Sequence, residues 1–378
     1  RIASERCCRR RRHSAANRGE GSRAMSGKSE SNVTAGEGGL VSTYVPLAPL
    51  TTLGVGGEAR FFIEAHTEKD IKNAITLAQR HTLPVFTLGG GSNILVPDTG
   101  VDGVVLKMAI SDIAFENDDD GILLVAGAGV RWDEVVDSAG ARGFFGIENL
   151  AGIPGTMGGA AVQNIGAYGA ELKNVFIYAD VIDSANGLSR RVTRAEAAFD
   201  YRTSFFKKHR EHIITHVALR LTERAEPNIS YADLTRAHEE GVPLTTPTEI
   251  AHAVRVIRNK KFPSTPGEGT VGSFFENPII SSESFSSLTK RFPDLPGFPQ
   301  ADGRIKVSLA WILDHALSLK GFTKGLVRLY EQHPLVIVAR PGARAAEIDA
   351  FARDIEALVF AATGITIERE AETFGVSG

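Results

Sequence analysis

We predict an α+β protein with a larger N-terminal part and a smaller C-terminal part. Strand-like and helix-like segments alternate along the chain, but the Gly-x-Gly-x-x-Gly fingerprint of a Rossmann domain is missing. Two glycine-rich stretches, at 88–95 and 153–160, lie in the larger part. A segment rich in proline and glycine at 263–269 is typical of a loop or linker, and we place a domain boundary near it.

The first elements that the sequence predicts form a strand–helix–strand unit. Residues 58–64 and 84–88 have the composition of strands. Between them, Thr67 and Asp70 can cap the start of a helix. The buried face of that helix is indicated by residues at helical spacing, namely Ile71, Ala74, Ile75 and Ala78.

The same patterns predict the later elements. Strands are expected at 103–107, 122–126, 175–183, 213–221, 272–280, 335–338 and 365–370. Helices are expected at 132–141, 245–260, 307–315 and 343–362. In the second of these helices, Thr245 or Thr246 is the candidate cap and Pro247 suits the first turn.

The composition disfavours several classes of protein. A formal net charge of −3 gives no general case for nucleic-acid binding, and no apolar run is long enough to cross a bilayer. Both cysteines precede Met25, so the rest of the chain has no disulfide, thiolate metal site or cysteine nucleophile. The histidines lack the spacing of a metal site. We therefore expect a cytoplasmic protein that needs no metal, nucleic acid, membrane or obligate protein partner.

The first residues differ from the rest. Residues 1–24 contain the arginine cluster at 9–12 and have no apolar stretch typical of a secretory signal. A nucleic-acid-binding arm, a targeting peptide, or upstream sequence that is absent from the mature protein all remain open, and Met25 resembles a natural start. Because residues 26–39 are rich in Gly, Ser, Glu and Asn, we expect the whole leader, 1–39, to be disordered.

The two glycine-rich stretches predict a nucleotide site. Glycine permits positive φ and close approach of a ligand, and successive N–H groups in such turns can bind phosphate. The alternative is a pair of tight turns at strand ends. A third stretch at 163–169 (Gln-Asn-Ile-Gly-Ala-Tyr-Gly) favours the nucleotide. Two phosphate-binding loops suggest a dinucleotide, which usually indicates redox chemistry.

Several motifs stand in the order found in one known family. They are Thr52-Leu-Gly-Val-Gly56, the two glycine-rich stretches, Gly127-Ala-Gly-Val, Gly146-Ile-Glu-Asn-Leu, Tyr201-Arg-Thr-Ser, Gly272-Ser-Phe-Phe-Glu-Asn-Pro278, Pro299-Gln-Ala-Asp-Gly303 and Ile367-Glu-Arg-Glu370. In this respect the chain resembles the UDP-N-acetylenolpyruvoylglucosamine reductase (MurB) family from about Thr51 to Gly375. It resembles the subtype that has an extra loop with a tyrosine.

The resemblance implies a two-part FAD-binding domain of the vanillyl-alcohol-oxidase (PCMH) type and a smaller α/β substrate-binding domain. The implied boundaries are 40–108 and 109–262 for the FAD-binding subdomains, 263–363 for the substrate-binding domain, and 364–378 for a C-terminal return segment. FAD and NADPH are the implied cofactors. The implied FAD-binding residues are Gly89, Gly90, Gly91, Ser92, Asn93, Ile153, Pro154, Gly155, Gly158, Gly159, Asn164, Gly166, Ala167 and Tyr168.

The family's reaction transfers a hydride to the enolpyruvyl group of a UDP-sugar, and it needs charge stabilisation at the carboxylate and a proton donor. By resemblance, Arg202 and Glu370 act at the carboxylate and Ser273 donates the proton; a shifted register would give Glu368 the role of Glu370. The implied substrate-binding residues are Tyr231, Arg258, Lys261, Asn277 and Gln300.

Two positions raise questions about this assignment. Glu276 stands where a basic residue is common in the family, and it adds negative charge near an anionic substrate. Arg60 is a candidate to face the flavin. The rival interpretations are an FAD-dependent oxidase of an alcohol or hydroxy acid on the same fold, and a flavin-binding paralogue without catalytic activity.

Overall fold

The computed structural model describes residues 33–34, 40–118, 120–224, 227–263 and 267–376. The predictions for residues 1–24 lie outside these described residues. Within 26–39, only Val33–Thr34 is described. It forms strand β1, which pairs with β2 (Leu40–Pro46), so the expectation of disorder is wrong for these two residues.

The first sheet contains the strand–helix–strand unit. Its strand order is β1-β2-β3-β6-β4, with β3 at Glu58–Ala65, β4 at Val85–Leu88 and β6 at Val101–Met108. Both β3 and β4 pair with β6 in parallel, as a right-handed crossover through a helix requires. β2 was not predicted, and it adds an antiparallel strand beside β3.

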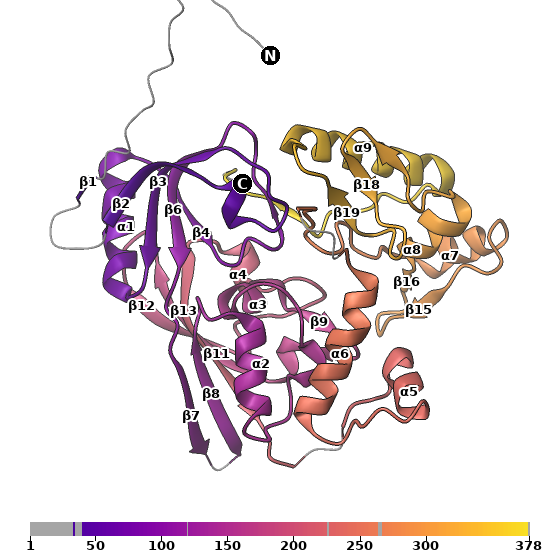
Figure 1. The fold of residues 1–378 in the computed structure, drawn as a ribbon, viewed down its shortest axis with the longest axis horizontal. Helices are drawn as coiled ribbons and strands as arrows, with labels where there is room; N and C mark the ends of the chain where they lie inside the picture. The colour runs from indigo at the N-terminus through magenta and orange to yellow at the C-terminus, as the bar shows by residue number, and fades with distance from the viewer. Residues whose placement is uncertain (1–32, 35–39, 119, 225–226, 264–266, 377–378) are drawn as a thin grey trace, which may run out of the picture. The chain divides into compact units, whose positions relative to one another are not determined.

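Helix α1 (Glu68–His81) connects β3 to β4 and confirms the predicted cap. Thr67 accepts a hydrogen bond from the Asp70 N–H, and the Asp70 carboxylate accepts one from the Thr67 N–H, which forms a capping box. The four apolar residues predicted for its inner face are buried (Ile71, Ala74, Ile75 and Ala78). This helix therefore packs on the sheet and fixes the course of the chain into the first glycine-rich stretch (Figure 1).

The second sheet is antiparallel, in the order β12-β11-β13-β8-β7 (Figure 1). Its strands are β7 (Ile113–Asp118), β8 (Gly121–Gly127), β11 (Phe176–Asp183), β12 (Ser189–Thr193) and β13 (His212–Leu221). Helix α3 (Met157–Gln163) packs on its strands β8 and β13, while α2 (Trp132–Gly140) packs against α3 and against α6 (Pro247–Lys261). Thr246 caps α6 in a second capping box with Glu249, which decides between the two candidate caps.

The C-terminal part has a hydrophobic core of its own, built on α9 (Ala345–Thr363) and a small sheet of β17 (Thr323–Lys324), β18 (Val327–Leu329) and β19 (Ile337–Ala339). A second small sheet contains β14 (Ile279–Ile280), β15 (Gly297–Pro299) and β16 (Ile305–Val307). The larger core lies almost entirely before residue 255. We propose the domain boundary near 263 on this basis.

Some elements of the C-terminal part differ from those predicted. Residues 272–278 form no strand, and only the last two residues of the predicted 272–280 strand belong to β14. The strand predicted at 365–370 is also wrong: these residues pair with 273–276 only through one isolated bridge, between Phe275 and Arg369. The helix predicted at 307–315 begins at Leu309 as α8 (Leu309–Trp311) and continues as the π-helix η4 (Ile312–Ala316). The strand expected at 335–338 is displaced to 337–339.

The C-terminal segment returns to the first part of the chain. Strand β20 (Glu372–Thr373) pairs in parallel with β5 (Ile94–Leu95), which follows the first glycine-rich stretch. The remaining elements are short: α4 (Phe205–Lys208), α5 (Ala232–Glu239), α7 (Ser282–Thr289), β9 (Gly166–Ala167), β10 (Ala170–Glu171), η1 (Ala48–Leu50), η2 (Glu148–Leu150) and η3 (Leu172–Asn174). Within the described part of the chain, every helix is too short or too polar to traverse a bilayer.

Candidate active site

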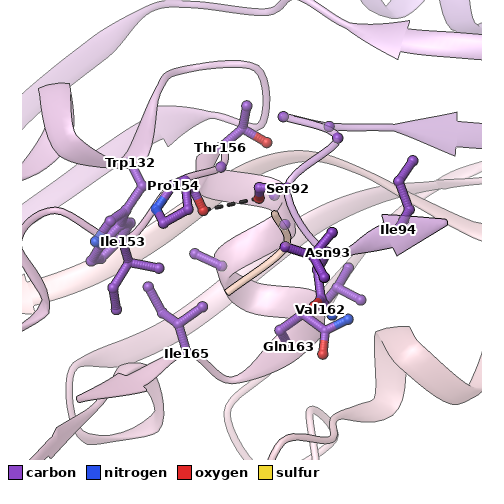
Figure 2. A pocket seen from close by; sticks show the side chains of 18 of the residues that line it. Ser92, Asn93, Ile94, Trp132, Ile153, Pro154, Thr156, Val162, Gln163 and Ile165 are labelled. Carbon is purple, nitrogen blue, oxygen red and sulfur yellow. Dashed lines mark hydrogen bonds between the residues drawn. The ribbon is translucent and has the colours of Figure 1, made fainter. Parts of the chain in front are cut away.

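A cavity of about 580 Å³ brings together both glycine-rich stretches and the return segment. Its lining extends in sequence from Thr52 to Phe374, so distant parts of the chain form it together. Much of the wall is apolar and includes Trp132, Ile153, Val162 and Ile165, which Figure 2 shows around the opening between the two stretches. A cavity of this kind suits a flat aromatic ligand with a polar or charged end.

The two glycine-rich stretches contact each other directly. The Ser92 hydroxyl donates a hydrogen bond to the Pro154 carbonyl at 3.0 Å, the contact drawn in Figure 2. A Cβ atom on Gly90 would lie 2.6 Å from the Cα atom of Gly155, and Gly91 has a φ of +64°. Glycine is therefore required by close approach and by conformation, because a larger residue would separate the stretches.

Several donors in these stretches have no partner in the described part of the chain. The N–H groups of Gly90, Gly91, Ser92 and Gly155 donate no hydrogen bond to any other described residue. The Thr156 hydroxyl is likewise buried without a partner among the described residues, and it faces the same cavity. The buried donors of Gly91 and Thr156 need an acceptor, and a pyrophosphate supplies several, which the half-buried N–H groups beside them can also reach. The residues therefore fit the phosphate-containing part of a dinucleotide such as FAD.

Arg202, Ser273 and Glu370 all line this cavity although they are far apart in sequence. The Arg202 Nε atom lies 3.0 Å from a carboxylate oxygen of Glu370, and an Arg202 Nη atom donates to the Gly166 carbonyl at 2.9 Å. Arg202 has a φ of +52°, which is unusual for a residue with a side chain. Its backbone is thus held in a costly conformation that aims the guanidinium at this end of the cavity.

Glu370 is held by its backbone as well as by its ion pair. Its N–H donates to the Phe274 carbonyl at 2.9 Å, and its carbonyl accepts from the Asn93 side-chain amide at 2.9 Å. Burial raises the pKa of the Glu370 carboxyl, while Arg202 opposes that rise. Glu368 is exposed, so the structure places Glu370 rather than Glu368 at Arg202. The strand predicted at 365–370 would place Glu368 and Glu370 on the same side, but no strand forms there.

Ser273 follows Gly272, which has a φ of +79° and open space beside it. A Cβ atom on Gly272 would approach no atom closer than 3.8 Å, a ring carbon of Phe262. Ser273 forms an isolated bridge with Val336 of the C-terminal part. Its position is therefore fixed by the C-terminal part, while its neighbourhood leaves room for a ligand.

A second group of polar side chains gathers around Lys261 on α6. Its Nζ atom lies 2.6 Å from Asp233 and close to the rings of Tyr168 and Tyr231, whose centroids are 5.1 Å apart. Burial raises the pKa of Tyr168 to about 12. Nearby, burial together with Lys261 and Arg258 lowers the pKa of His333 to about 4. At neutral pH Tyr168 and His333 are therefore uncharged, and Asp233 offsets the charge of Lys261. The positive charge of Arg258 leaves this region cationic, which suits an anionic ligand.

The sequence-predicted site residues separate into two groups. The residues that line the cavity are Gly89, Gly90, Gly91, Ser92, Asn93, Ile153, Pro154, Gly155, Gly158, Gly159, Gly166, Arg202, Arg258, Ser273 and Glu370. Those outside its lining are Asn164, Ala167, Tyr168, Tyr231, Lys261, Asn277 and Gln300.

Some of the outer residues have partners within the protein. Asn164 is fully buried, and its side chain bonds to Glu171, to the Asp200 carbonyl and to the Lys173 N–H. The side-chain oxygen of Asn277 accepts from the Leu309 N–H. Gln300 donates to the Phe298 carbonyl. Arg60 pairs with Asp102 at 2.9 Å and does not line the cavity, so it does not face the cofactor site as suggested.

Sequence reasoning missed a polar cluster at one side of the cavity. Glu372 accepts from the Gln163 amide at 2.7 Å and from Arg210 at 2.7 Å, and Lys207 lies 3.7 Å from it. All four residues line the cavity. Gln163 belongs to the stretch 163–169 noted in the sequence, whereas its link to Glu372 depends on a contact across 209 positions that no local pattern reveals.

Comparison with protein families finds two matches. Residues 59–193 match the model of an FAD binding domain. Residues 264–374 match the C-terminal domain of UDP-N-acetylenolpyruvoylglucosamine reductase. The second match begins next to the boundary proposed above.

Curated proteins and a solved structure give the same result. UDP-N-acetylenolpyruvoylglucosamine reductase from Pseudomonas aeruginosa is 38% identical over 339 residues, which cover 88% of this chain and 98% of that protein. The reductase from Thermobifida fusca is 35% identical over 88% of this chain and 98% of its own length. The crystal structure of the reductase from Thermus caldophilus has a TM-score of 0.61 at 26% identity and covers 87% of this chain and 97% of its own.

Proposed function

The chain belongs to the UDP-N-acetylenolpyruvoylglucosamine reductase family, and from that premise we propose that it reduces UDP-N-acetyl-3-O-(1-carboxyvinyl)-glucosamine to UDP-N-acetylmuramate. It is an FAD-dependent oxidoreductase of peptidoglycan precursor synthesis. The observation that carries the proposal is one cavity in which unpartnered phosphate-type donors and the Arg202–Glu370 pair occur together. NADPH is the proposed reductant, and the cytoplasm is the proposed place of action.

The residues that would hold FAD follow from the free donors. Gly90, Gly91, Ser92 and Gly155 offer N–H groups, and Thr156 offers a hydroxyl, to the pyrophosphate. The apolar wall around Trp132 would exclude water from the ring system. Bound FAD supplies the hydride that NADPH provides.

Arg202 and Glu370 would act where negative charge develops in the substrate. Addition of hydride to C3 of the enolpyruvyl group leaves an electron pair on C2 that spreads onto the adjacent carboxylate. The guanidinium of Arg202 keeps its charge in a partly buried site and can form two hydrogen bonds to that carboxylate. Glu370, whose pKa is raised by burial, can be protonated and then donates a hydrogen bond instead of repelling the substrate.

Ser273 would complete the reaction by protonating C2. Its hydroxyl is a weak acid, so it serves only if the carbon is strongly basic and the geometry is preset. The proton that Ser273 gives to C2 is replaced from solvent, which restores the hydroxyl. For the UDP group, the cationic region around Arg258, Lys261 and Tyr231 offers charge and an aromatic face.

Absorbance of the pure protein under anaerobic conditions tests this function. We expect a yellow protein that NADPH bleaches and that the UDP-enolpyruvyl sugar restores to yellow. Bleaching without restoration by the sugar would refute the substrate. Rapid reoxidation by oxygen in preference to the sugar would favour an oxidase.

The substitution Ser273→Ala tests the proton donor. We expect turnover to fall about a hundredfold or more, the range for loss of a general acid, while NADPH still bleaches the flavin at the wild-type rate. Stopped-flow absorbance separates the two half-reactions. Ser286→Ala, on the exposed face of α7, is the matched control and should leave both unchanged. An unchanged second half-reaction in Ser273→Ala would exclude this serine as the donor.

A further inference from the structure

A lysine lies beneath the first glycine-rich stretch. Lys107 is near the carboxyl end of β6, between Glu64 of β3 and Leu88 of β4 in the sheet register. Its Nζ atom donates a hydrogen bond to the carbonyl of Gly89, the first glycine of the stretch. Ligands in parallel sheets commonly bind beyond the carboxyl ends of the strands, which is where this contact lies.

The charge of Lys107 has no close counterion among the residues that the structure describes. None of the described carboxylates lies within ion-pair distance of its Nζ atom. The Glu64 carboxylate affects the charge of Lys107 only at longer range. The Glu64 side chain is 55% exposed and pairs with His66 instead. Burial lowers the pKa of Lys107 from its ordinary value because it disfavours the charged form, and Glu64 opposes that effect. An anion bound nearby would offset that cost.

The bond from Lys107 orients the peptide that carries the first free donor. The Gly89 carbonyl and the Gly90 N–H belong to one peptide group, and in a trans peptide they point in opposite directions. A cation fixed on the carbonyl therefore directs the Gly90 N–H away from Lys107. Because Gly90 lines the cavity and its N–H has no partner among the described residues, the donor is available to a ligand there.

The second glycine-rich stretch has a comparable arrangement. Arg258 Nε donates to the Gly152 carbonyl at 3.2 Å, just before Ile153. Neither stretch contains a basic residue of its own, as the sequences 88–95 and 152–160 show. Each stretch is thus bound by a cation through a carbonyl at its start, and the unpartnered Thr156 hydroxyl lies where the two meet (Figure 2).

We propose that Lys107 is a positioning residue of the FAD site: it holds the first glycine-rich stretch with its free N–H groups toward the cavity and supplies positive charge to the pyrophosphate from behind that stretch. This inference rests on the proposed binding of FAD by the two stretches. It assigns a role to a residue that does not itself line the cavity. A charge acting through a peptide group strengthens the donor on the other side of that group.

The test uses the full chain stripped of FAD and titrated with FAD, with binding followed by flavin fluorescence. Lys107→Met keeps the length of the side chain but removes its charge, and Lys107→Arg keeps the charge. We expect Lys107→Met to weaken FAD binding about tenfold or more, as loss of a buried charge-assisted bond would, and Lys107→Arg to restore most of the affinity. Lys72→Met, at an exposed lysine of α1, is the matched control and should bind FAD as the wild type does.

Riboflavin distinguishes a charge effect from loosening of the fold, because it has the ring system but no phosphate. Lys107→Met should weaken FAD binding much more than riboflavin binding. Equal losses for the two ligands, or an FAD affinity within about twofold of the wild type, would overturn the proposal.

Should Lys107→Met fail to fold, Lys107→Gln decides the question in the same titrations, because it also removes the charge. FAD binding should again weaken much more than riboflavin binding, and equal losses for the two ligands would overturn the proposal. These titrations are independent of the proposed reaction. A wild type that binds FAD but does not reduce the sugar nucleotide would refute the proposed function, and the titrations would still decide the role of Lys107.

Discussion

Glu276 occupies a place where negative charge is unfavourable. It is half-buried, and burial is the main reason that its pKa rises to about 7. Lys207 and Arg202 oppose the rise, whereas Glu370 and Glu368 add to it. The sequence suggested a lasting negative charge near an anionic substrate. The structure indicates instead a carboxyl that is largely neutral below pH 7, so its conflict with the substrate depends on pH.

This shift makes a prediction about stability. In the unfolded chain the Glu276 carboxyl titrates near 4.5 and in the folded protein near 7, so between these values the folded state binds more protons. Stability from this group is therefore present below pH 4.5 and is lost as pH rises through 7. Glu276→Gln should remove that loss and raise the urea midpoint above the wild-type value at pH 8, but not at pH 5.

The control for Glu276→Gln is a carboxylate without a comparable environment. Glu116 is exposed on β7, and Glu116→Gln should shift the midpoint equally at both pH values. Equilibrium urea unfolding followed by circular dichroism measures all three proteins. A Glu276→Gln midpoint that differs from the wild type by the same amount at pH 5 and pH 8 would contradict the expected protonation.

The two glycine-rich stretches work as one unit, because their free N–H groups are aligned only while the two loops fit closely together. A Cβ atom on Gly90 would meet the Gly155 Cα atom at 2.6 Å, and neither backbone can move without shifting the free N–H groups. We expect Gly90→Ala to weaken FAD binding about tenfold or more, because two backbone donors would lose alignment. Titration of the FAD-free protein by flavin fluorescence measures the effect.

Gly187→Ala separates loop geometry from general stability. Gly187 lies in the turn between β11 and β12 with a φ of +73° and no atom within 4 Å of a Cβ position. Alanine there costs about 1 kcal/mol of conformational strain but should leave FAD affinity unchanged. Equal losses of FAD affinity in the two variants would show that the effect of Gly90→Ala is not local.

Elements with strong local signals were predicted well, and elements that depend on distant partners were not. The caps at Thr67 and Thr246 and the helical spacing that follows located α1 and α6 from a few residues. The alternation at 365–370 was misleading, because Ile365 and Ile367 are buried in the C-terminal core while the segment meets 273–276 at one isolated bridge, between Phe275 and Arg369. Alternate residues are buried both in a strand and in an extended segment that belongs to no sheet. Only a continuous ladder of hydrogen bonds to a neighbouring strand distinguishes the two.

The same distinction holds for the site across the whole molecule. Many of the residues assigned from motifs meet in one cavity. The sequence does not show the short distance between Arg202 and Glu370, nor the contact of Glu372 with Arg210 at one side of that cavity. Lys107 has no motif at all, and its importance is visible only from the carbonyl that it contacts. The fold decides which distant chain segments come into contact. Local sequence patterns therefore predicted the glycine-rich stretches but not the lysine that contacts the first of them.

FAD should stabilise the whole molecule, because its cavity is lined by members of all three hydrophobic clusters. Trp132 belongs to the largest cluster, Val271 to the C-terminal one, and Leu88 and Phe374 to the third. A ligand that binds only the folded state adds about 2.7 kcal/mol when its free concentration is about 100 times Kd. Removing FAD should therefore lower Tm, measured by calorimetry at fixed protein concentration.

Hydrogen exchange shows which segments of the chain FAD stabilises. Hydrogen exchange should increase in the FAD-free protein at 89–93 and 153–156, where the cavity wall includes donors that the cofactor would satisfy, and much less in α9, whose buried face packs inside the C-terminal core. A uniform increase over the chain would indicate that FAD acts only through global stability. An unchanged Tm with unchanged exchange in these segments would exclude the cavity as the FAD site, since binding there must protect the backbone groups that it engages.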